Sequence, residues 1–218
     1  MEILSRTYEA NRTRKNYSRV AWFYDGWSRL TESRAMKKIV EFAGIRNGIT
    51  ILEIAVGTGR LFRTLVKLNP EGKNIGMDLS DEMLNKARKK LSGLPAGSYV
   101  LQEGDVLNLE MENDRVDVLI NSFMVDLMPE KDFDRIAATF NRILKPGGIT
   151  VVSTMSFGTR PVHKMWFGIA RRMPGLMTGC RPVSFRPYLE KAGFRIEEQA
   201  QLSQNTFPSE VIKARKPG

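Results

Sequence analysis

The turn from Ala55 to Gly59 holds residues whose types and spacing could bind a ligand. Gly57 and Gly59 let the chain bend sharply and let a ligand approach the backbone with no Cβ in the way. Glu53 comes four residues before Gly57, and a carboxylate there suits a cationic ligand better than a diphosphate. Phe62 stands where a dinucleotide site needs its third glycine for close helix packing, which argues against such a site.

Two further acids follow at the ends of the next two predicted strands. Asp78 is placed to accept hydrogen bonds from a ribose diol, and Asp105 from an exocyclic amino group. Val106 and Met83 could cover the two faces of a purine, and Asn121 ends the fourth predicted strand at the same edge. The pattern indicates a ligand with a positive centre, a ribose and a purine but no phosphate. S-adenosylmethionine has these parts.

The elements that must position these residues alternate between strand and helix. Apolar and β-branched runs predict strands over 49–55, 74–78, 99–105, 116–123 and 149–155. Helices are predicted over 60–68, from Ser80, over 130–143 and over 184–192, with a turn at 145–148. FRIEEQAQL and FPSEVIKAR predict two last strands as a hairpin-like pair at one sheet edge. We therefore expect an α/β fold, a doubly wound and mostly parallel seven-stranded sheet, with ligands bound at the carboxyl ends of its strands.

Four motifs in order resemble the signature of the class I S-adenosylmethionine-dependent methyltransferases, over about residues 15–155. They are LEIAVGTG (52–59), GMDLS (76–80), GDVLNL (104–109) and LKPGG (144–148). Tyr24-Asp25 and the stretch 180–194 are most similar to the ubiquinone- and menaquinone-biosynthesis C-methyltransferases and the small phospholipid N-methyltransferases.

The resemblance implies S-adenosylmethionine as cofactor, S-adenosylhomocysteine as product, and a Rossmann-like methyltransferase fold. The cofactor residues would be Glu53, Ala55, Gly57, Gly59, Asp78, Leu79, Met83, Asp105, Val106 and Asn121. The N-terminal helices would close over the cofactor and bring Tyr17 or Tyr24 near the sulfonium. The family usually has glycine where this chain has Ala55, so the site is expected to bind its cofactor but to be slightly narrower.

A single domain, 1–218, is expected. It would comprise a helical lid (1–48), a cofactor-binding core (49–155), a substrate-lid insertion (156–182), and a C-terminal helix with edge strands (183–218). Asp126, Tyr24 and His163 are the catalytic candidates. Asp126 could be a general base or merely a helix-start acid, Tyr24 could cap the cofactor or pack in the lid, and His163 could be a base or structural. Methyl transfer asks little of side chains beyond alignment, because the sulfonium is already activated. No metal site is expected.

The net charge of +10 sits at the two ends of the chain, with +5 in residues 1–50 and +7 in residues 160–218. An anionic membrane, nucleic acid or an acidic substrate would suit this placement, and so would a protein that is merely basic. Segment 160–182 mixes apolar residues with arginines, as in a membrane-surface helix or an ordinary substrate lid. With one cysteine, no membrane-length apolar run and no secretory signal, we expect a cytoplasmic protein, peripheral at the membrane at most.

The favoured acceptor is a small or lipid-like molecule, such as a quinone precursor or a phospholipid head group. An RNA methyltransferase is a weaker alternative, because Asn121-Ser122-Phe123-Met124 replaces the Asn/Asp-Pro-Pro-aromatic tetrad of amino-directed base methyltransferases. A nicotinamide dehydrogenase and a non-catalytic partner that only binds the cofactor also remain open. The sequence does not define the oligomeric state.

Overall fold

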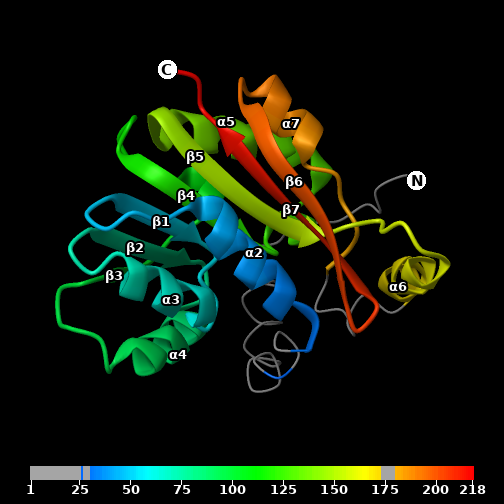
Figure 1. Ribbon diagram of the computed structural model, residues 1–218, viewed down its shortest axis with the longest axis horizontal. Helices are drawn as coiled ribbons and strands as arrows, with labels where there is room; N and C mark the ends of the chain where they lie inside the picture. Colours follow the sequence, from blue (N-terminus) through cyan, green and yellow to red (C-terminus); the bar gives the residue numbers. More distant parts are fainter. Residues whose placement is uncertain (1–25, 27–29, 173–179) are drawn as a thin grey trace.

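The computed structural model describes residues 26, 30–172 and 180–218, and its centre is one seven-stranded sheet (Figure 1). The strands are β1 (Thr50–Ile54), β2 (Lys73–Asp78), β3 (Val100–Glu103), β4 (Val116–Ser122), β5 (Leu144–Met155), β6 (Arg195–Gln204) and β7 (Phe207–Arg215). The helices are α2 (Ser33–Ala43), α3 (Arg60–Leu68), α4 (Asp81–Leu91), α5 (Phe133–Ile143), α6 (Pro161–Arg172) and α7 (Arg186–Lys191). Short 3-10 turns lie at Val106–Asn108 (η1), Val125–Leu127 (η2) and Glu130–Asp132 (η3).

The strand order is β3-β2-β1-β4-β5-β7-β6, which confirms the predicted doubly wound sheet. The pairs among the first five strands of this order are parallel, whereas β7 runs antiparallel to both β5 and β6. The connections from β1 lead to one side of the sheet and those from β4 to the other. The carboxyl ends of β1 and β4 therefore lie side by side at the switch point, which is where such sheets bind ligands.

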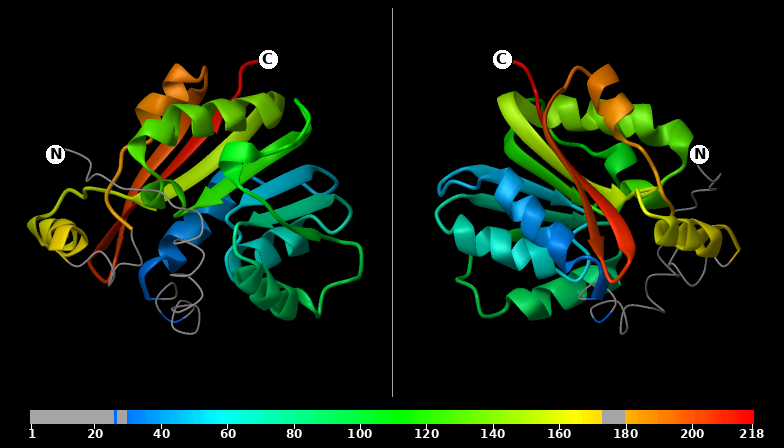
Figure 2. Two further views of the ribbon diagram at one scale, coloured as in Figure 1. Left: turned by 180° about the vertical axis from the view of Figure 1, so that it is seen from behind. Right: turned by 45° about the vertical axis from the view of Figure 1, so that its right-hand side comes forward.

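Helices cover both faces of the sheet (Figures 1 and 2). On one face Ile39, Phe62 and Leu84 of α2, α3 and α4 join a core with Val118, Ile120 and Val151. On the other face Phe133, Phe140 and Leu189 of α5 and α7 pack with Leu52, Leu119 and Val152. Successive residues of the central strands thus enter opposite cores, which explains why these strands are apolar without interruption.

Of two predicted features at the β5–β7 end of the sheet, one differs in the structure and one is confirmed. The predicted turn at 145–148 lies within β5, because Gly147 (φ +76°) forms an irregularity there and donates from its N–H to the Lys216 carbonyl at 3.0 Å. The predicted hairpin-like pair at one sheet edge is confirmed: β7 lies between β5 and β6, and β6 is the edge strand on this side. The difference at 145–148 arises from pairing between segments about 70 residues apart, which local patterns do not report.

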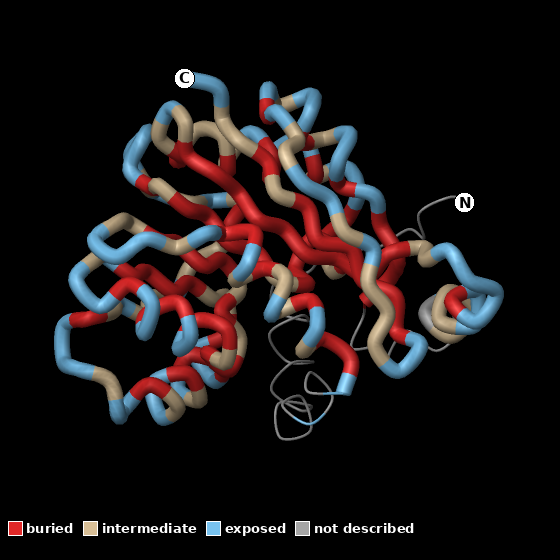
Figure 3. The backbone as a smooth tube through the Cα atoms, in the orientation of Figure 1, coloured by how far each residue is buried: buried red, intermediate tan, exposed pale blue. Residues whose placement is uncertain are grey.

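Residues 156–172, which follow β5 and include α6, form an arm that stands off from the sheet beside the end of the β6–β7 hairpin (Figure 2). We call this segment the α6 arm. Its helix α6 is largely exposed or half-buried, with His163 the buried exception (Figure 3). Trp166 Nε1 donates to Thr206 Oγ1 at 3.1 Å, and its indole packs edge-on against Phe207 with centroids 5.4 Å apart. Asn205 Nδ2 donates to the Leu30 carbonyl at 2.8 Å. The hairpin turn therefore connects the α6 arm to the start of the α2 segment.

Candidate cofactor-binding site

The glycine turn between β1 and α3 adopts a left-handed backbone at three positions. Ala55, Gly57 and Gly59 have φ values of +62°, +54° and +77°. A Cβ on Gly59 would lie 2.8 Å from Leu91 Cδ1 and 2.9 Å from Ala87 Cβ, so this glycine lets the start of α3 pack against α4. The loop is consequently held close to β2 and α4, and its backbone N–H groups lie at the carboxyl edge of the sheet.

Ala55 has a left-handed backbone at a position where the family usually has glycine, and this conformation is unfavourable for alanine. A non-glycine residue in the left-handed region is disfavoured by roughly 1–2 kcal/mol because its Cβ approaches the following carbonyl. Ala55 is half-buried and lines a pocket at this turn. Ala55 thus adds a methyl group to the lining of this pocket, and the slight narrowing of the cofactor site stays a prediction.

Glu53 is a buried carboxylate at the penultimate position of strand β1, just before the loop. The residue is 2% exposed, and its Oε2 has no hydrogen-bond partner among the described residues. Burial raises the pKa of Glu53 well above its ordinary value, and the charge of Asp78 raises it further. A positive ligand group beside this carboxylate would supply the missing partner.

Around Glu53 lies a small pocket with both acidic and basic walls. Glu53 shares it with Glu32 and Met36 from the α2 segment, Arg60 from α3 and Ser122 from the end of β4. The remaining lining residues belong to the turn and α3: Ala55, Val56, Gly57, Thr58 and Leu61. Carboxylates and a guanidinium together suit a zwitterionic ligand group, such as the amino acid end of a nucleoside–amino acid conjugate.

Asp78 holds the glycine loop in place. Its Oδ2 accepts from the Gly57 N–H at 2.7 Å, and its Oδ1 accepts from the Ser80 N–H at 2.9 Å. Burial raises the pKa of Asp78, while the backbone N–H donors act in the opposite direction. An ionised carboxylate accepts about four hydrogen bonds, and the N–H groups of Gly57, Ser80 and Leu79 use three of them, so Asp78 can still accept one from a ribose hydroxyl. Ser80 also caps α4 by accepting from the Met83 N–H at 3.3 Å, which fixes the helix that carries Met83.

The other predicted cofactor residues lie on the same edge of the sheet. Asp105 is half-buried and caps η1, with its Oδ1 accepting from the Leu107 N–H at 2.9 Å. Val106 and Met83 are buried, and Leu79 is half-buried. Asn121 is fully buried, and its Nδ2 donates to the Ile54 carbonyl at 3.0 Å, which ties the ends of β1 and β4 together. Its Oδ1 has no partner within the part of the chain that the structure describes.

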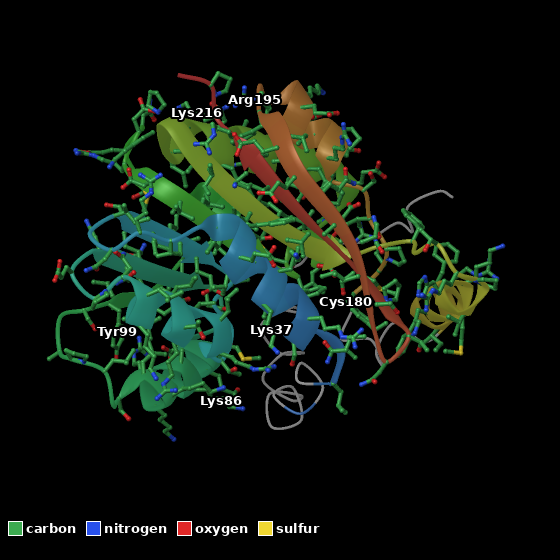
Figure 4. All side chains as sticks on the ribbon, viewed as in Figure 1. Lys37, Lys86, Tyr99, Cys180, Arg195 and Lys216 are labelled. Atoms are coloured by element: carbon green, nitrogen blue, oxygen red, sulfur yellow. The ribbon has the colours of Figure 1, made fainter. Side chains whose placement is uncertain are left out.

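Asp126 lies beyond β4 in a buried polar cluster that includes Arg181. Asp126 Oδ2 accepts from the Met155 N–H at 3.2 Å, and Arg181 donates to the carbonyls of Asp126 and Met128, each at 2.7 Å. Burial raises the pKa of Asp126 to about 6, partly opposed by the Met155 N–H, by Arg181 and by a hydrogen bond from Cys180. Cys180 (labelled in Figure 4) is where the described chain resumes after the arm. The cluster therefore connects the exits of β4 and β5 to the returning segment.

His163 serves the α6 arm. Its Nδ1 accepts from the N–H groups of Thr159 and Arg160, both at 3.1 Å, and its Nε2 lies 3.2 Å from Ser203 Oγ. An Nδ1 that accepts two N–H bonds carries no proton, so the ring is neutral with its proton on Nε2. Burial, with the charge of Arg160, lowers the pKa of His163. These bonds favour the structural interpretation of His163, and they give the prediction of a catalytic base no support.

Tyr24 and Tyr17 lie outside the described residues, so their predicted place near the sulfonium stays a prediction. Arg60 and Ser122, which directly follow Gly59 and Asn121, also line this pocket, although they were not among the predicted cofactor-binding residues. Glu32 and Arg181 had no comparable local signal, because long-range packing brings them to this edge. Within the described chain no group of three or more His, Cys, Asp or Glu side chains could hold a metal ion.

The sheet order and the acidic, glycine-containing edge define a methyltransferase-type α/β domain, and comparison with known proteins agrees. Residues 51–148 match a family model described as a methyltransferase domain. An arsenite methyltransferase of Halobacterium salinarum is 28% identical over 193 residues, which cover 81% of this chain and 49% of the relative. A demethylmenaquinone methyltransferase of Lactobacillus johnsonii is 30% identical over 155 residues, which cover 68% of this chain and 63% of the relative. The chain thus spans about half to just under two thirds of these curated relatives.

Among solved structures, magnesium protoporphyrin IX methyltransferase from Synechocystis, with bound S-adenosylhomocysteine, superposes with a TM-score of 0.75. It is 16% identical and covers 95% of this chain and all of its own, so it shows the shared fold. Residues 51–148 therefore form a methyltransferase domain of the class that the sequence motifs indicated, and S-adenosylmethionine is the cofactor of that class.

Proposed function

We propose that the protein transfers the methyl group of S-adenosylmethionine to a small or lipid-like acceptor and releases S-adenosylhomocysteine. The observation that carries the proposal is the buried Glu53 carboxylate, which lacks a partner beside the glycine loop at the switch point. Leaving a buried carboxylate unsatisfied is costly, so its retention in the core indicates a cationic ligand. The amino acid end of S-adenosylmethionine provides such a cation.

The proposed cofactor contacts follow the geometry of the edge. Glu53 binds the ammonium group, Arg60 the carboxylate, and Asp78 the ribose. Leu79, Met83 and Val106 cover the adenine, and Asp105 accepts from its amino group. Ala55, Gly57, Gly59 and Asn121 shape the loop and the ends of β1 and β4.

When bound, the cofactor supplies an activated methyl group on a sulfonium, and the reaction is a direct displacement. The chain's own task is to align the acceptor opposite the sulfur and to keep water out. For an acceptor that must lose a proton, Asp126 is the proposed base, since its pKa of about 6 lies close to neutral pH. Tyr24, in the N-terminal segment, is proposed to cap the cofactor near the sulfonium.

Among acceptors, a quinone precursor or a phospholipid head group is favoured over arsenite. Arsenic(III) is a soft centre that prefers several thiolates, and this chain has one cysteine, Cys180, which is buried. The demethylmenaquinone methyltransferase relative fits an acceptor with an apolar tail. No helix among the described residues is long and apolar enough to cross a bilayer.

The test is incubation with methyl-labelled cofactor and separate lipid, quinone, small-amine and RNA extracts, followed by fractionation. We expect label in a lipid or small-molecule fraction, and loss of that label in a Glu53→Gln variant but not in the exposed control Glu71→Gln. Label confined to RNA would replace the proposal with the RNA alternative. Tight cofactor binding without label in any fraction would identify a non-catalytic partner protein.

A further inference from the structure

We propose that the outer face of α6, together with Leu30 beside the hairpin turn, docks on an anionic lipid bilayer. The assignment extends the proposed function by naming the surface on which the enzyme works. Bilayer binding is separable from catalysis, because it involves none of the residues placed in the cofactor site. We call this surface the α6 face. It comprises four residues of α6 and two outside it: Val162, Lys164, Met165 and Arg171, with Leu30 and Arg160.

Exposed apolar side chains gather at this rim. Five large apolar residues of the described chain are strongly exposed, and Leu30 (58%), Val162 (38%) and Met165 (51%) are three of them. The Leu30 carbonyl bonds to Asn205 while α6 bonds to Thr206, so Leu30 and α6 flank one hairpin turn. Single exposed apolar residues are ordinary, but several at one rim indicate an interaction surface.

The charge of the same surface is entirely positive. Between Asp134 and Glu190 the sequence contains no aspartate or glutamate. The exposed residues Arg160, Lys164 and Arg171 lie on and just before α6, and none of its described side chains is acidic. Exposed apolar groups interspersed with cations match the interfacial zone of a membrane that carries anionic head groups.

The inner face of α6 is already occupied by its own chain. His163 bonds the N-terminal turn of the helix and approaches Ser203, and Trp166 packs on Phe207. These contacts turn the outer face away from the β6–β7 hairpin. Because β5 ends at Met155 on the carboxyl edge, the arm stands at the edge where the cofactor pocket lies. A lipid acceptor would therefore be delivered on the correct side of the sheet.

The aromatic residues of the arm distinguish a bilayer from RNA. Single-stranded RNA is bound by cations together with exposed aromatic rings on which bases stack. Here Trp166 packs edge-on against Phe207, and the half-buried Phe167 packs against Phe157 with centroids 6.1 Å apart. The exposed apolar groups are aliphatic or thioether side chains, which partition into lipid but offer no stacking surface.

The test measures partition of the full chain onto phosphatidylglycerol vesicles, with phosphatidylcholine vesicles as the neutral comparison. Each basic group at an anionic surface contributes roughly fivefold, so Lys164→Gln/Arg171→Gln should weaken partition about 25-fold. Met165→Gln should weaken it about fivefold by removing an apolar group from the interface. The matched pair Lys67→Gln/Lys89→Gln, two exposed helix lysines on α3 and α4, should leave it unchanged.

Three results would overturn the proposal: no partition onto phosphatidylglycerol, equal losses from both charge pairs, or no effect of Met165→Gln. RNA binding that depends on Lys164 and Arg171 but not on Met165 would assign the surface to nucleic acid. A parallel titration with S-adenosylmethionine keeps the outcomes distinguishable, since intact cofactor binding without vesicle partition refutes only the membrane surface. Thermal melts of each variant verify that the arm remains folded.

Discussion

The substitution Glu53→Gln should make the cofactor-free protein more stable against unfolding and should weaken its binding of the cofactor. In the empty site the Glu53 carboxylate is buried, has an oxygen without a partner, and is repelled by Asp78. Replacing it by a neutral amide removes the cost of an unpaired buried charge, about 1–3 kcal/mol. For a chain of this size that corresponds to a rise in Tm of roughly 3–9 °C.

Cofactor binding should change in the opposite direction. A hydrogen bond between a carboxylate and an ammonium group contributes about 1.5–3 kcal/mol, so its loss should raise the Kd for S-adenosylmethionine roughly 10- to 150-fold. Adenosine lacks the amino acid end and should bind both forms equally. Calorimetric titration of the two ligands against wild type, Glu53→Gln and the exposed control Glu71→Gln measures the difference.

The pH dependence provides a second readout of the same substitution. Because the pKa of Glu53 is raised in the fold, its contribution favours the empty protein at low pH and is lost as pH rises through the raised pKa. Over that same range the cofactor should bind more tightly, as the carboxylate ionises. Glu53→Gln should flatten both trends. Equal loss of adenosine and cofactor binding, or a less stable empty variant, would refute the assignment of Glu53.

Three other substitutions test particular parts of the structure. Ala55→Gly should stabilise the chain by about 1 kcal/mol in urea melts, because φ is +62°, whereas Ala137→Gly within α5 should destabilise it. With Asp126 as the base, wild-type turnover should rise as the pH passes through about 6, and the Asp126→Asn variant should lose that rise. An unchanged pH profile in Asp126→Asn would show that Asp126 has only a structural role. His163→Leu should lower the free energy of unfolding by about 1–3 kcal/mol at pH above 6.5 and by progressively less below it, because the lowered pKa keeps the native ring neutral. His163→Asn should retain part of this stability, because its side-chain oxygen can still accept a hydrogen bond from the N–H groups of the arm. In both variants kcat with a water-soluble acceptor should be unchanged.

Local patterns predicted the elements that carry the cofactor site. The helix over 60–68 matches α3, and the strand over 49–55 contains β1 with one residue fewer at each end. These elements follow from apolar runs, from Ser80 as a helix cap and from the glycine turn, each of which acts within a few residues. The edge that gathers Glu53, Asp78 and Asp105 then follows from the parallel order of the strands.

Long-range contacts account for what the sequence did not reveal. Arg181 is 1% exposed because its guanidinium bonds carbonyls more than 50 residues earlier in the chain, and an isolated arginine in a basic segment gives no sign of this. His163 was the only histidine and so invited a catalytic interpretation, yet its bonds to Thr159 and Arg160 fix the arm. Position in the sequence could not separate the two roles, since both use the same ring nitrogens.

A crystal structure of the chain with S-adenosylhomocysteine would test the central assignment most directly. We predict the ribose against the Asp78 carboxylate, the adenine between Met83 and Val106, and the ammonium group on Glu53. A ligand bound away from the glycine turn, or a Glu53 carboxylate that still lacks a partner in the complex, would contradict the account.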